Sequence, residues 1–192
     1  ILFSGDIGNA PEPLLNAPES PAGVHYLVME SVYGDRAHEG REERKRALRS
    51  MIEATAAKGG TLLIPSFSLQ RTQLLLSEIN DMVEREGMKS IPVYLDSPLA
   101  TRVTEIFRAH TDALNAATRE KNAGGDDIFS FKHLTVVGTT RESGAIHKEK
   151  GPKVIIAGAG MSNGGRIRGH EQELLDDPNT TLLFVGYQAA GT

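Results

Sequence analysis

Short apolar runs alternate with longer amphipathic segments along this chain. Most of the short runs are continuously apolar rather than alternating, which is typical of strands covered on both faces of a parallel sheet. The pattern predicts strands at residues 1–4, 25–29, 61–64, 91–95, 134–137, 153–157 and 181–185. The first of these, Ile1 to Ser4, has the composition of a buried strand.

Amphipathic helices are expected between the strands, at residues 41–58, 69–86, from 97 onward, and 165–175. The first three carry apolar residues at helical spacing. These stripes are Leu48, Met51, Ile52 and Thr55, then Leu75, Ile79, Met82 and Val83, then Leu99, Val103, Ile106 and Phe107. Ser97-Pro98 opens the third helix with an N-cap residue followed by proline at the first helical position. Residues 111–131 have weak helix potential and a Gly124-Gly125 break, so no element is assigned there.

Strand–helix alternation at this spacing predicts right-handed βαβ units in an α/β domain. We expect three layers, with a largely parallel sheet and helices on both faces. Four prolines between residues 9 and 21 indicate an extended linker, placed at 11–23. The chain opens inside an apolar run without an initiator Met and closes on residues 185–192 as a strand and a loop, which indicates a fragment of a longer polypeptide.

Composition narrows the function classes only slightly. The 192 residues are 39% hydrophobic and 24% charged, as in an ordinary globular domain, and the net charge of −4 gives no overall attraction to nucleic acid. There is no cysteine, so any metal must be held by oxygen or imidazole. The sequence has no signal peptide and no apolar run of about 20 residues, so we expect a cytoplasmic protein with no membrane contact.

Polar residues stand where several predicted strands end. They are Glu30-Ser31, Ser66 to Ser68, Asp96-Ser97 and the segment 157–166. Any one of these taken alone is most simply a helix N-cap. In an open parallel sheet, however, such junctions gather at the C-terminal edge, where α/β proteins place their sites. Four junctions at one edge therefore predict a binding cleft.

The segment after residue 157 is rich in glycine. Gly158-x-Gly160-x-x-x-Gly164 lies between a predicted strand and a predicted helix, so its N–H groups suit a phosphate. The third glycine comes one residue too late for a dinucleotide fingerprint. A phosphate or nucleic-acid backbone contact, a plain tight turn and a nucleotide site all remain open.

Metal chemistry has little support from spacing alone. Asp6 lies among glycines at a strand end, where it is either a turn residue or a carboxylate with room to reach a metal. The six histidines are scattered and none forms an H-x-H, H-x-x-x-H or H-E-x-x-H pair; they are His25, His38, His110, His133, His147 and His170. Each is predicted to be a surface or capping residue, with His38 and His170 nearest the cleft. The chain is not expected to hold a complete metal site by itself.

Six motifs taken in order resemble those of the β-CASP family of metallo-β-lactamase-fold RNA-processing nucleases. Phe3-Ser-Gly-Asp-Ile-Gly8 resembles the strand-end motif of the lactamase fold, and Met29-Glu-Ser-Val-Tyr-Gly-Asp-Arg36 resembles the E-S-T-Y-G motif, with Val32 in place of Thr. Ile64-Pro-Ser-Phe-Ser-Leu-Gln-Arg71 and Asp96-Ser-Pro-Leu-Ala100 are similar to two central motifs. Gly160-Met-x-x-Gly-Gly-Arg166 and Gly186-Tyr-Gln-Ala-Ala-Gly-Thr192 are similar to the last two. The resemblance spans essentially the whole chain.

The resemblance implies an RNA phosphodiesterase with two zinc ions, which lower the pKa of a bound water and neutralise charge on the phosphoryl oxygens. Asp6 would bridge the metals, and Glu30 would orient a histidine that protonates the leaving oxygen. The candidates for holding single-stranded RNA are Ser66, Arg71, Ser97, Ser162 and Arg166. The two arginines suit phosphate because guanidinium binds it bidentately, although a salt bridge that caps a helix is the alternative for both.

The same resemblance implies that parts of the catalytic apparatus lie elsewhere. The H-x-H-x-D-H cluster would precede residue 1, and two later histidines would follow residue 192. We therefore expect residues 1–10 to be a lactamase-fold remnant and 24–192 the β-CASP domain, with zinc bound weakly or not at all and no RNA cleavage by this chain alone. A non-catalytic RNA-binding relative and a Rossmann-type nucleotide-binding domain are the alternatives. The sequence leaves open endonucleolytic or exonucleolytic cleavage, the RNA target, and a possible homodimer.

Overall fold

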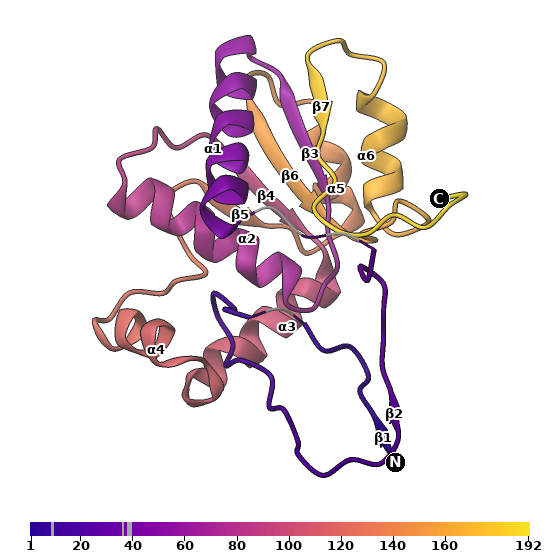
Figure 1. Cartoon of the computed structure of the whole chain (residues 1–192). Helices are drawn as coiled ribbons and strands as arrows, with labels where there is room; N and C mark the ends of the chain where they lie inside the picture. The colour runs from indigo at the N-terminus through magenta and orange to yellow at the C-terminus, as the bar shows by residue number, and fades with distance from the viewer. Residues whose placement is uncertain (9, 36, 38–39) are drawn as a thin grey trace.

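A five-stranded, wholly parallel sheet forms the centre of the chain in the computed structural model, which describes residues 1–8, 10–35, 37 and 40–192 (Figure 1). The strand order is β5-β4-β6-β3-β7. These strands are β3 (Thr61–Pro65), β4 (Val93–Asp96), β5 (Leu134–Val136), β6 (Lys153–Ala157) and β7 (Thr180–Leu182). A separate parallel pair joins β1 (Leu2–Phe3) to β2 (Leu27–Val28). Each strand predicted from the sequence is present, with its ends shifted by a few residues.

Helices cover both faces of the large sheet, which confirms the predicted three layers. In Figure 1, α1 (Arg41–Lys58) and α2 (Arg71–Asn80) lie on one face, and α5 (Thr140–Ile146) and α6 (Ile167–Leu174) lie on the other. Two further helices, α3 (Pro98–Ala109) and α4 (Ala116–Ala123), extend the layer that contains α2. Among the described residues, no helix combines the length and the apolarity that a membrane span needs.

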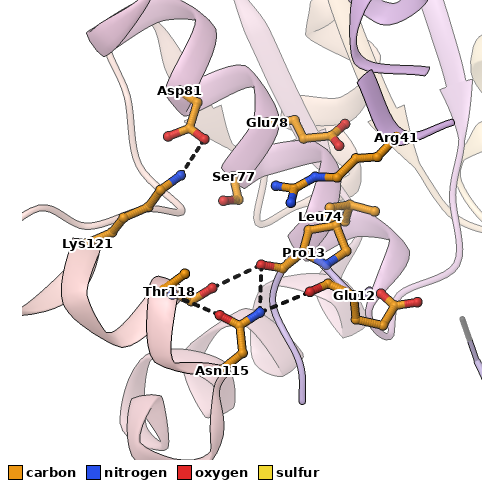
Figure 2. Close-up of a pocket in the computed structure, with 11 residues that line it drawn as sticks. Glu12, Pro13, Arg41, Leu74, Ser77, Glu78, Asp81, Asn115, Thr118 and Lys121 are labelled. Atoms are coloured by element: carbon orange, nitrogen blue, oxygen red, sulfur yellow. Dashed lines mark hydrogen bonds and ion pairs between the residues drawn. The ribbon is translucent and has the colours of Figure 1, made fainter. Parts of the chain in front are cut away.

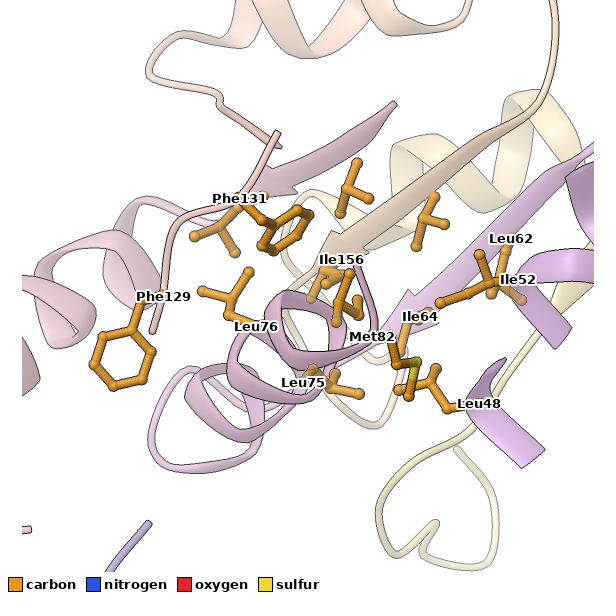
Figure 3. Packing of buried hydrophobic residues seen from close by; sticks show 14 of the residues in the cluster. Leu48, Ile52, Leu62, Ile64, Leu75, Leu76, Met82, Phe129, Phe131 and Ile156 are labelled. Carbon is orange, nitrogen blue, oxygen red and sulfur yellow. The ribbon is translucent and has the colours of Figure 1, made fainter. Parts of the chain in front are cut away.

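Alternate residues along each strand point to opposite faces of the sheet, so the buried apolar residues form two clusters, one on each face. On β3, Leu62 and Ile64 face the larger cluster, which is shown in Figure 3 and includes Leu48 of α1 and Leu76 of α2. Leu63, which lies between them, faces the smaller cluster with residues of α5 and α6. All residues of β3, β4 and β6 are buried, as the continuous apolar runs predicted. Complete burial of such a side chain stabilises the fold by about 1.5–3 kcal/mol.

Some apolar positions predicted to be buried are exposed instead. The prediction of a buried strand at residues 1–4 is wrong, since Ile1 is 82% and Phe3 73% exposed. The reason is that β1 pairs only with β2, and neither strand is fully buried by the described residues. Met51, Leu99 and Ile106 also lie on the solvent side of their helices. The buried residues of α1 are Leu48, Ile52 and Thr55, so the predicted apolar stripe is confirmed without Met51.

The helical predictions differ from the structure in three places. The single helix expected at 69–86 ends as α2 at Asn80 and continues as a π-helical turn, Asp81–Arg85. The helix α4 lies in the stretch that received no assignment. The helix α5 was not predicted either, although it begins with a capping box in which Thr139 accepts the Glu142 N–H at 3.2 Å. That Thr-x-x-Glu pattern was visible in the sequence.

Part of the predicted linker packs against the main domain. Leu14 is 3% exposed and belongs to the larger apolar cluster, and Leu15 forms a β-bridge with Leu114. The Asn115 amide group donates to the carbonyl oxygens of Glu12, Pro13 and Leu15 at 3.0–3.2 Å. These contacts order residues 12–15 beside α4. The domain limits at residues 10 and 24 stay a prediction.

Candidate active site and the surrounding motifs

The junctions after β3, β4 and β6 meet at the C-terminal edge of the sheet, as predicted. Pro65 and Asp96 are both register partners of Ala157, the last residue of β6. The Ser66 N–H donates to the Ala157 carbonyl at 2.9 Å, and the Ser68 and Ser97 hydroxyls lie 3.3 Å apart. Strand register therefore brings three of the four polar segments to one place.

Ser66 and Ser97, two of the candidate RNA contacts, already have partners inside the protein. Ser66 is 2% exposed and its hydroxyl accepts from Thr72 at 3.0 Å. Ser97 is 7% exposed and caps α3, as predicted, by accepting the Ala100 N–H at 3.3 Å. Both hydroxyls thus hold the loops at the sheet edge in place. Their contact with RNA stays a prediction.

Asp96 is the centre of a buried polar cluster that the sequence did not reveal. It is fully buried, and its carboxylate accepts hydrogen bonds from the Ser143 hydroxyl and the Arg166 guanidinium. The His170 ring nitrogen Nε2 lies 2.7 Å from Asp96 Oδ2, the oxygen that also accepts from Ser143, whereas Arg166 donates to Oδ1. Burial by itself raises the pKa of Asp96, but the hydrogen bonds from His170, Ser143 and Arg166 and the charge of Arg166 together hold it below 3.8.

A second histidine extends this cluster toward the surface. His147 Nε2 lies 2.8 Å from His170 Nδ1, and the two rings meet edge to face. His170 is 1% exposed, so the prediction that every histidine is a surface or capping residue is wrong for it. The reason is that Asp96 and His147 satisfy both of its ring nitrogens. His38, the other histidine predicted near the cleft, lies outside the described residues.

We expect the pH dependence of stability to report on His147. Burial lowers its pKa below 6.5, and the charge of His170 lowers it further. A group whose folded pKa is depressed contributes stability that is present above its unfolded pKa and is lost as pH falls through the folded pKa. The free energy of unfolding should therefore fall as pH is lowered from about 7, and should fall less in His147→Gln. Urea titrations from pH 7 to 5 measure this, with exposed His25→Gln as control; equal slopes in all three proteins would contradict it.

Arg166 and Ser162, two more candidate RNA contacts, are also engaged within the protein. Besides Asp96, the Arg166 guanidinium donates to the carbonyls of Val137 at 3.3 Å and Gly138 at 3.0 Å. The Ser162 hydroxyl donates to Glu171 of α6. Arg166 therefore forms the salt bridge that the sequence had left as its alternative role. RNA binding by either residue stays a prediction.

The glycines of the 158–166 loop are needed for close packing. A Cβ atom on Gly160 would lie 2.6 Å from the Phe67 ring. One on Gly165, whose φ is +73°, would lie 2.3 Å from the Gly158 carbonyl oxygen. Packing within the loop and against Phe67 thus accounts for these two glycines without a bound nucleotide.

Arg71 differs from the other candidates. It is half-buried at the first turn of α2, and its side chain has no hydrogen bond or ion pair within the described part of the chain. Among the candidate RNA contacts, the Arg71 guanidinium is therefore the group least engaged in hydrogen bonds and ion pairs within the described residues.

The two carboxylates predicted to be catalytic stand at the ends of the paired strands β1 and β2. The Glu30 carboxylate accepts the N–H of Ile7 at 3.4 Å and that of Val32 at 3.1 Å. The Ser4 hydroxyl accepts the Glu30 N–H at 3.1 Å. The backbone next to Asp6 is thus tied directly to the Glu30 side chain. Neither the cavity beside residues 12–13 nor the hollow between α5 and α6 is lined by Asp6 or Glu30. A cleft from these residues to Arg71 and Arg166 stays a prediction.

Four of the motifs meet around Phe67. Tyr33 of the E-S-V-Y-G segment packs edge to face against Tyr187, with ring centroids 5.7 Å apart. A Cβ on Gly186 would lie 3.5 Å from the Phe67 ring, and the Gln188 amide donates to the Gly160 carbonyl at 2.8 Å. Figure 1 shows the segment after β2 turning toward the C-terminal segment. Residues up to 155 positions apart in the sequence, Tyr33 and Gln188 included, therefore form one continuous contact zone.

The residues described here do not fit a complete zinc centre. Within residues 1–8, 10–35, 37 and 40–192, no three His, Asp or Glu side chains come together in a way that could hold a metal. Asp6 can supply one carboxylate ligand. A zinc site would therefore need ligands that this set of residues does not provide.

A family model described as the Beta-Casp domain matches residues 72–192. The chain belongs to the β-CASP family. The matched β-CASP region begins one residue after Arg71 and includes the loops around Asp96, Gly160 and Gln188.

Relatives of this β-CASP chain extend the similarity to its full length. It is 35% identical over 191 residues to ribonuclease TTHA0252 of Thermus thermophilus and 31% identical over 195 residues to cleavage and polyadenylation specificity factor 73 of Drosophila melanogaster. It is 30% identical over 198 residues to endoribonuclease YSH1 of Eremothecium gossypii. Each alignment covers the whole chain, but the chain spans only 44%, 28% and 25% of these proteins respectively.

Proposed function

We propose that this chain is the β-CASP part of an RNA-processing nuclease that hydrolyses phosphodiester bonds. The observation that carries the proposal is the contact zone around Phe67, where motifs far apart in sequence meet at the C-terminal edge of the sheet. The names of the relatives support it, since two are called ribonuclease or endoribonuclease. The substrate we propose is single-stranded RNA, in a protein that resides in the cytoplasm.

Asp6 and Glu30 are the proposed catalytic carboxylates. The hydrogen bond from Ile7 to Glu30 keeps the ends of β1 and β2 together, which supports a shared role. Two backbone N–H groups also orient the Glu30 carboxylate. We propose that Glu30 positions a proton-donating histidine supplied by another segment, in the way that outer carboxylates orient imidazoles.

Arg71 is the proposed phosphate-binding residue of this chain. Its guanidinium has the bidentate geometry that phosphate needs and no described side-chain partner. Arg166, Ser66, Ser97 and Ser162 are proposed to act mainly by holding the loops beside it, because their side chains bond to neighbouring groups. We also propose that these four side chains contact the RNA.

Two zinc ions are the proposed cofactor of the longer protein. Zinc would supply an activated water and neutralise charge on the phosphoryl group. Asp6 is the one residue of this chain proposed to contact it. Since the described residues form no metal cluster, we expect the chain alone to bind zinc weakly and to leave RNA uncut.

Metal removal from a longer protein that carries this chain with its flanking segments tests the proposal. We expect that protein to cleave labelled single-stranded RNA, to lose the activity in a chelator and to regain it with zinc. The chain by itself should give no cleavage under the same conditions. Cleavage by the chain alone that disappears in Asp6→Ala would contradict the proposal that this chain supplies only part of the active site. A longer protein that binds RNA with zinc present but never cuts it would instead be a non-catalytic RNA-binding relative.

A further inference from the structure

Phe67 leaves part of its aromatic ring uncovered at the centre of the contact zone. The residue lies in the loop between β3 and α2 and is 43% exposed. Leu69 on the same loop, Leu99 after β4 and Tyr187 in the C-terminal segment are exposed as well. Strand register brings the loops after β3 and β4 to one edge of the sheet. Apolar side chains that are exposed together and surrounded by polar groups mark interaction sites.

The ring of Phe67 is held in place by glycine backbone at one edge. A Cβ atom on Gly160 would lie 2.6 Å from Phe67 Cδ2, and one on Gly186 would lie 3.5 Å from Cε2. Both glycines therefore approach the same edge of the ring, and neither has a side chain that could cover the rest of it. The Phe67 carbonyl also accepts the Thr72 N–H at 3.3 Å and the Thr72 hydroxyl at 2.8 Å. A ring that is fixed in advance loses little conformational freedom when a ligand packs on it.

A guanidinium without an ion pair follows four residues after this ring. Arg71 opens α2, and its side chain has no hydrogen bond or ion pair within the part of the chain that the structure describes. The N–H of the next residue, Thr72, is bound to the Phe67 carbonyl, so the first turn of α2 begins against the main chain of Phe67. The aromatic ring and the candidate phosphate ligand thus start from neighbouring points of the backbone.

Further positive charge lies along the starts of α1 and α2. Arg41 and Arg44 in the first turn of α1 and Arg71 in the first turn of α2 all act electrostatically on the carboxyl of Glu78. Figure 2 shows the charged groups of Arg41 and Glu78 side by side. One carboxylate cannot balance three guanidinium groups. Phosphates near the start of α2 would therefore meet positive charge.

Single-stranded nucleic acid has both features that this surface fits. Each nucleotide carries a flat base that can stack on an aromatic ring and a phosphate that can bind a cation. Such stacking tolerates any sequence, because every base has a π face. A purely apolar peptide would instead cover the neighbouring guanidinium without supplying a counter-charge, which is unfavourable. The surface therefore fits single-stranded RNA better than an apolar peptide.

We propose that Phe67 is a stacking platform for one base of a single-stranded RNA and that Arg71 binds a phosphate next to that base. The proposal rests on the proposed function, because it adds a base contact to the RNA that Arg71 binds there. It also gives the site a reason to prefer single strands. A base inside a duplex is already paired and stacked, so it cannot cover the ring without first leaving the helix.

Binding of this 192-residue chain to two oligonucleotides of equal length tests the stacking contact. One is oligouridine, and the other has the same sugars and phosphates but no bases. We expect oligouridine to bind about 5-fold more tightly or better, which is the lower end of what stacking one base on an aromatic side chain contributes. Phe67→Leu should remove most of this difference and leave the affinity for the base-free strand unchanged. Fluorescence anisotropy measures both affinities.

Three further variants separate stacking from other causes. Phe67→Tyr keeps an aromatic ring and should bind oligouridine like the unmutated chain. Tyr26→Leu removes an exposed ring next to β2 and should have no effect. Arg71→Gln should weaken the binding of both strands equally and reduce the salt dependence by about one phosphate contact. If circular dichroism shows that Phe67→Leu does not fold, Phe67→Met takes its place.

Several results would overturn the stacking contact. These are equal affinity of the unmutated chain for the two strands, no binding of oligouridine, and equal weakening of both strands, or of neither, in the folded Phe67 variant. In the longer protein, a Phe67→Leu change that lowers the melting temperature without altering RNA binding would show that the ring packs against another segment instead, which also overturns it.

Cleavage by the longer protein separates this proposal from the nuclease proposal. There, Phe67→Leu should raise KM for single-stranded RNA by about 5-fold or more and change kcat less, because the ring contacts a base rather than the reacting phosphate. Unchanged KM in a protein that cuts RNA would refute the stacking contact alone. A longer protein that binds RNA through Phe67 but never cuts it would refute the nuclease proposal and leave this one standing.

Discussion

Asp96→Ala is expected to lower the free energy of unfolding by roughly 3–5 kcal/mol, the range found when one member of a buried ion pair is removed. The carboxylate is fully buried and is the shared acceptor for Ser143, Arg166 and His170. Its removal leaves a buried imidazole and a largely buried guanidinium without their partner. Urea unfolding monitored by circular dichroism measures the change.

Asp126→Ala is the matched control for this loss. Asp126 pairs with Arg85 at 2.8 Å, but both side chains are more than a third exposed, so we expect a change of about 1 kcal/mol or less.

Acid titration of the unmutated protein provides a second readout of the Asp96 cluster. Because the folded pKa of Asp96 is depressed, its contribution is present above about pH 4, the unfolded value, and is lost as pH falls through the lower folded pKa. An Asp96→Ala protein as stable as the control would show that the cluster contributes little.

Glu30→Gln, made in the longer protein, is expected to reduce the rate of RNA cleavage by about 10–100-fold, the usual cost of losing a carboxylate that orients an active-site histidine. The amide keeps the size of the side chain but has one acceptor oxygen in place of two. It therefore retains one of the bonds to Ile7 and Val32 and loses the negative charge. Single-turnover cleavage of a labelled RNA measures the rate.

Two comparisons separate catalysis from folding in this experiment. Glu19→Gln removes the same charge from an exposed position of the same N-terminal segment and should leave cleavage unchanged. Asp6→Ala should reduce cleavage at least as much as Glu30→Gln, because it removes a proposed metal ligand. The Glu30 variant should keep its melting temperature within a few degrees, since loss of a single neutral hydrogen bond costs about 1 kcal/mol. Unchanged cleavage in Glu30→Gln would remove Glu30 from the mechanism.

The Asp96 cluster also gives the D-S-P-L-A motif a physical explanation. Asp96 ends β4, Ser143 belongs to α5, and Arg166 and His170 belong to the loop and helix after β6. A single carboxylate thus fixes two helices and the glycine-rich loop relative to β4. Arg166 holds residues 137 and 138 through the same guanidinium. We infer that this cluster makes the edge of the sheet rigid where the motifs meet.

The elements and their order were largely predictable, because they depend on local patterns. The continuous apolar runs identified the strands, including the fully buried β3 and β6. Ser97-Pro98 identified the start of α3, and the Ser97 hydroxyl does cap it. The eight-residue α4 has a weak local signal, and α5 is marked by the short capping box at Thr139 without a long apolar stripe, so neither helix is predicted from the pattern.

The sequence by itself determined the layers of the domain, the polar residues at the strand ends and the resemblance in which Asp6 and Glu30 have roles, because hydrophobic period and motif spacing are local properties of a chain. Only the tertiary structure decided which polar groups are already bound to one another. It paired Arg166 and buried His170 with Asp96. Those outcomes depend on strand register and helix packing, which bring together residues up to 74 positions apart.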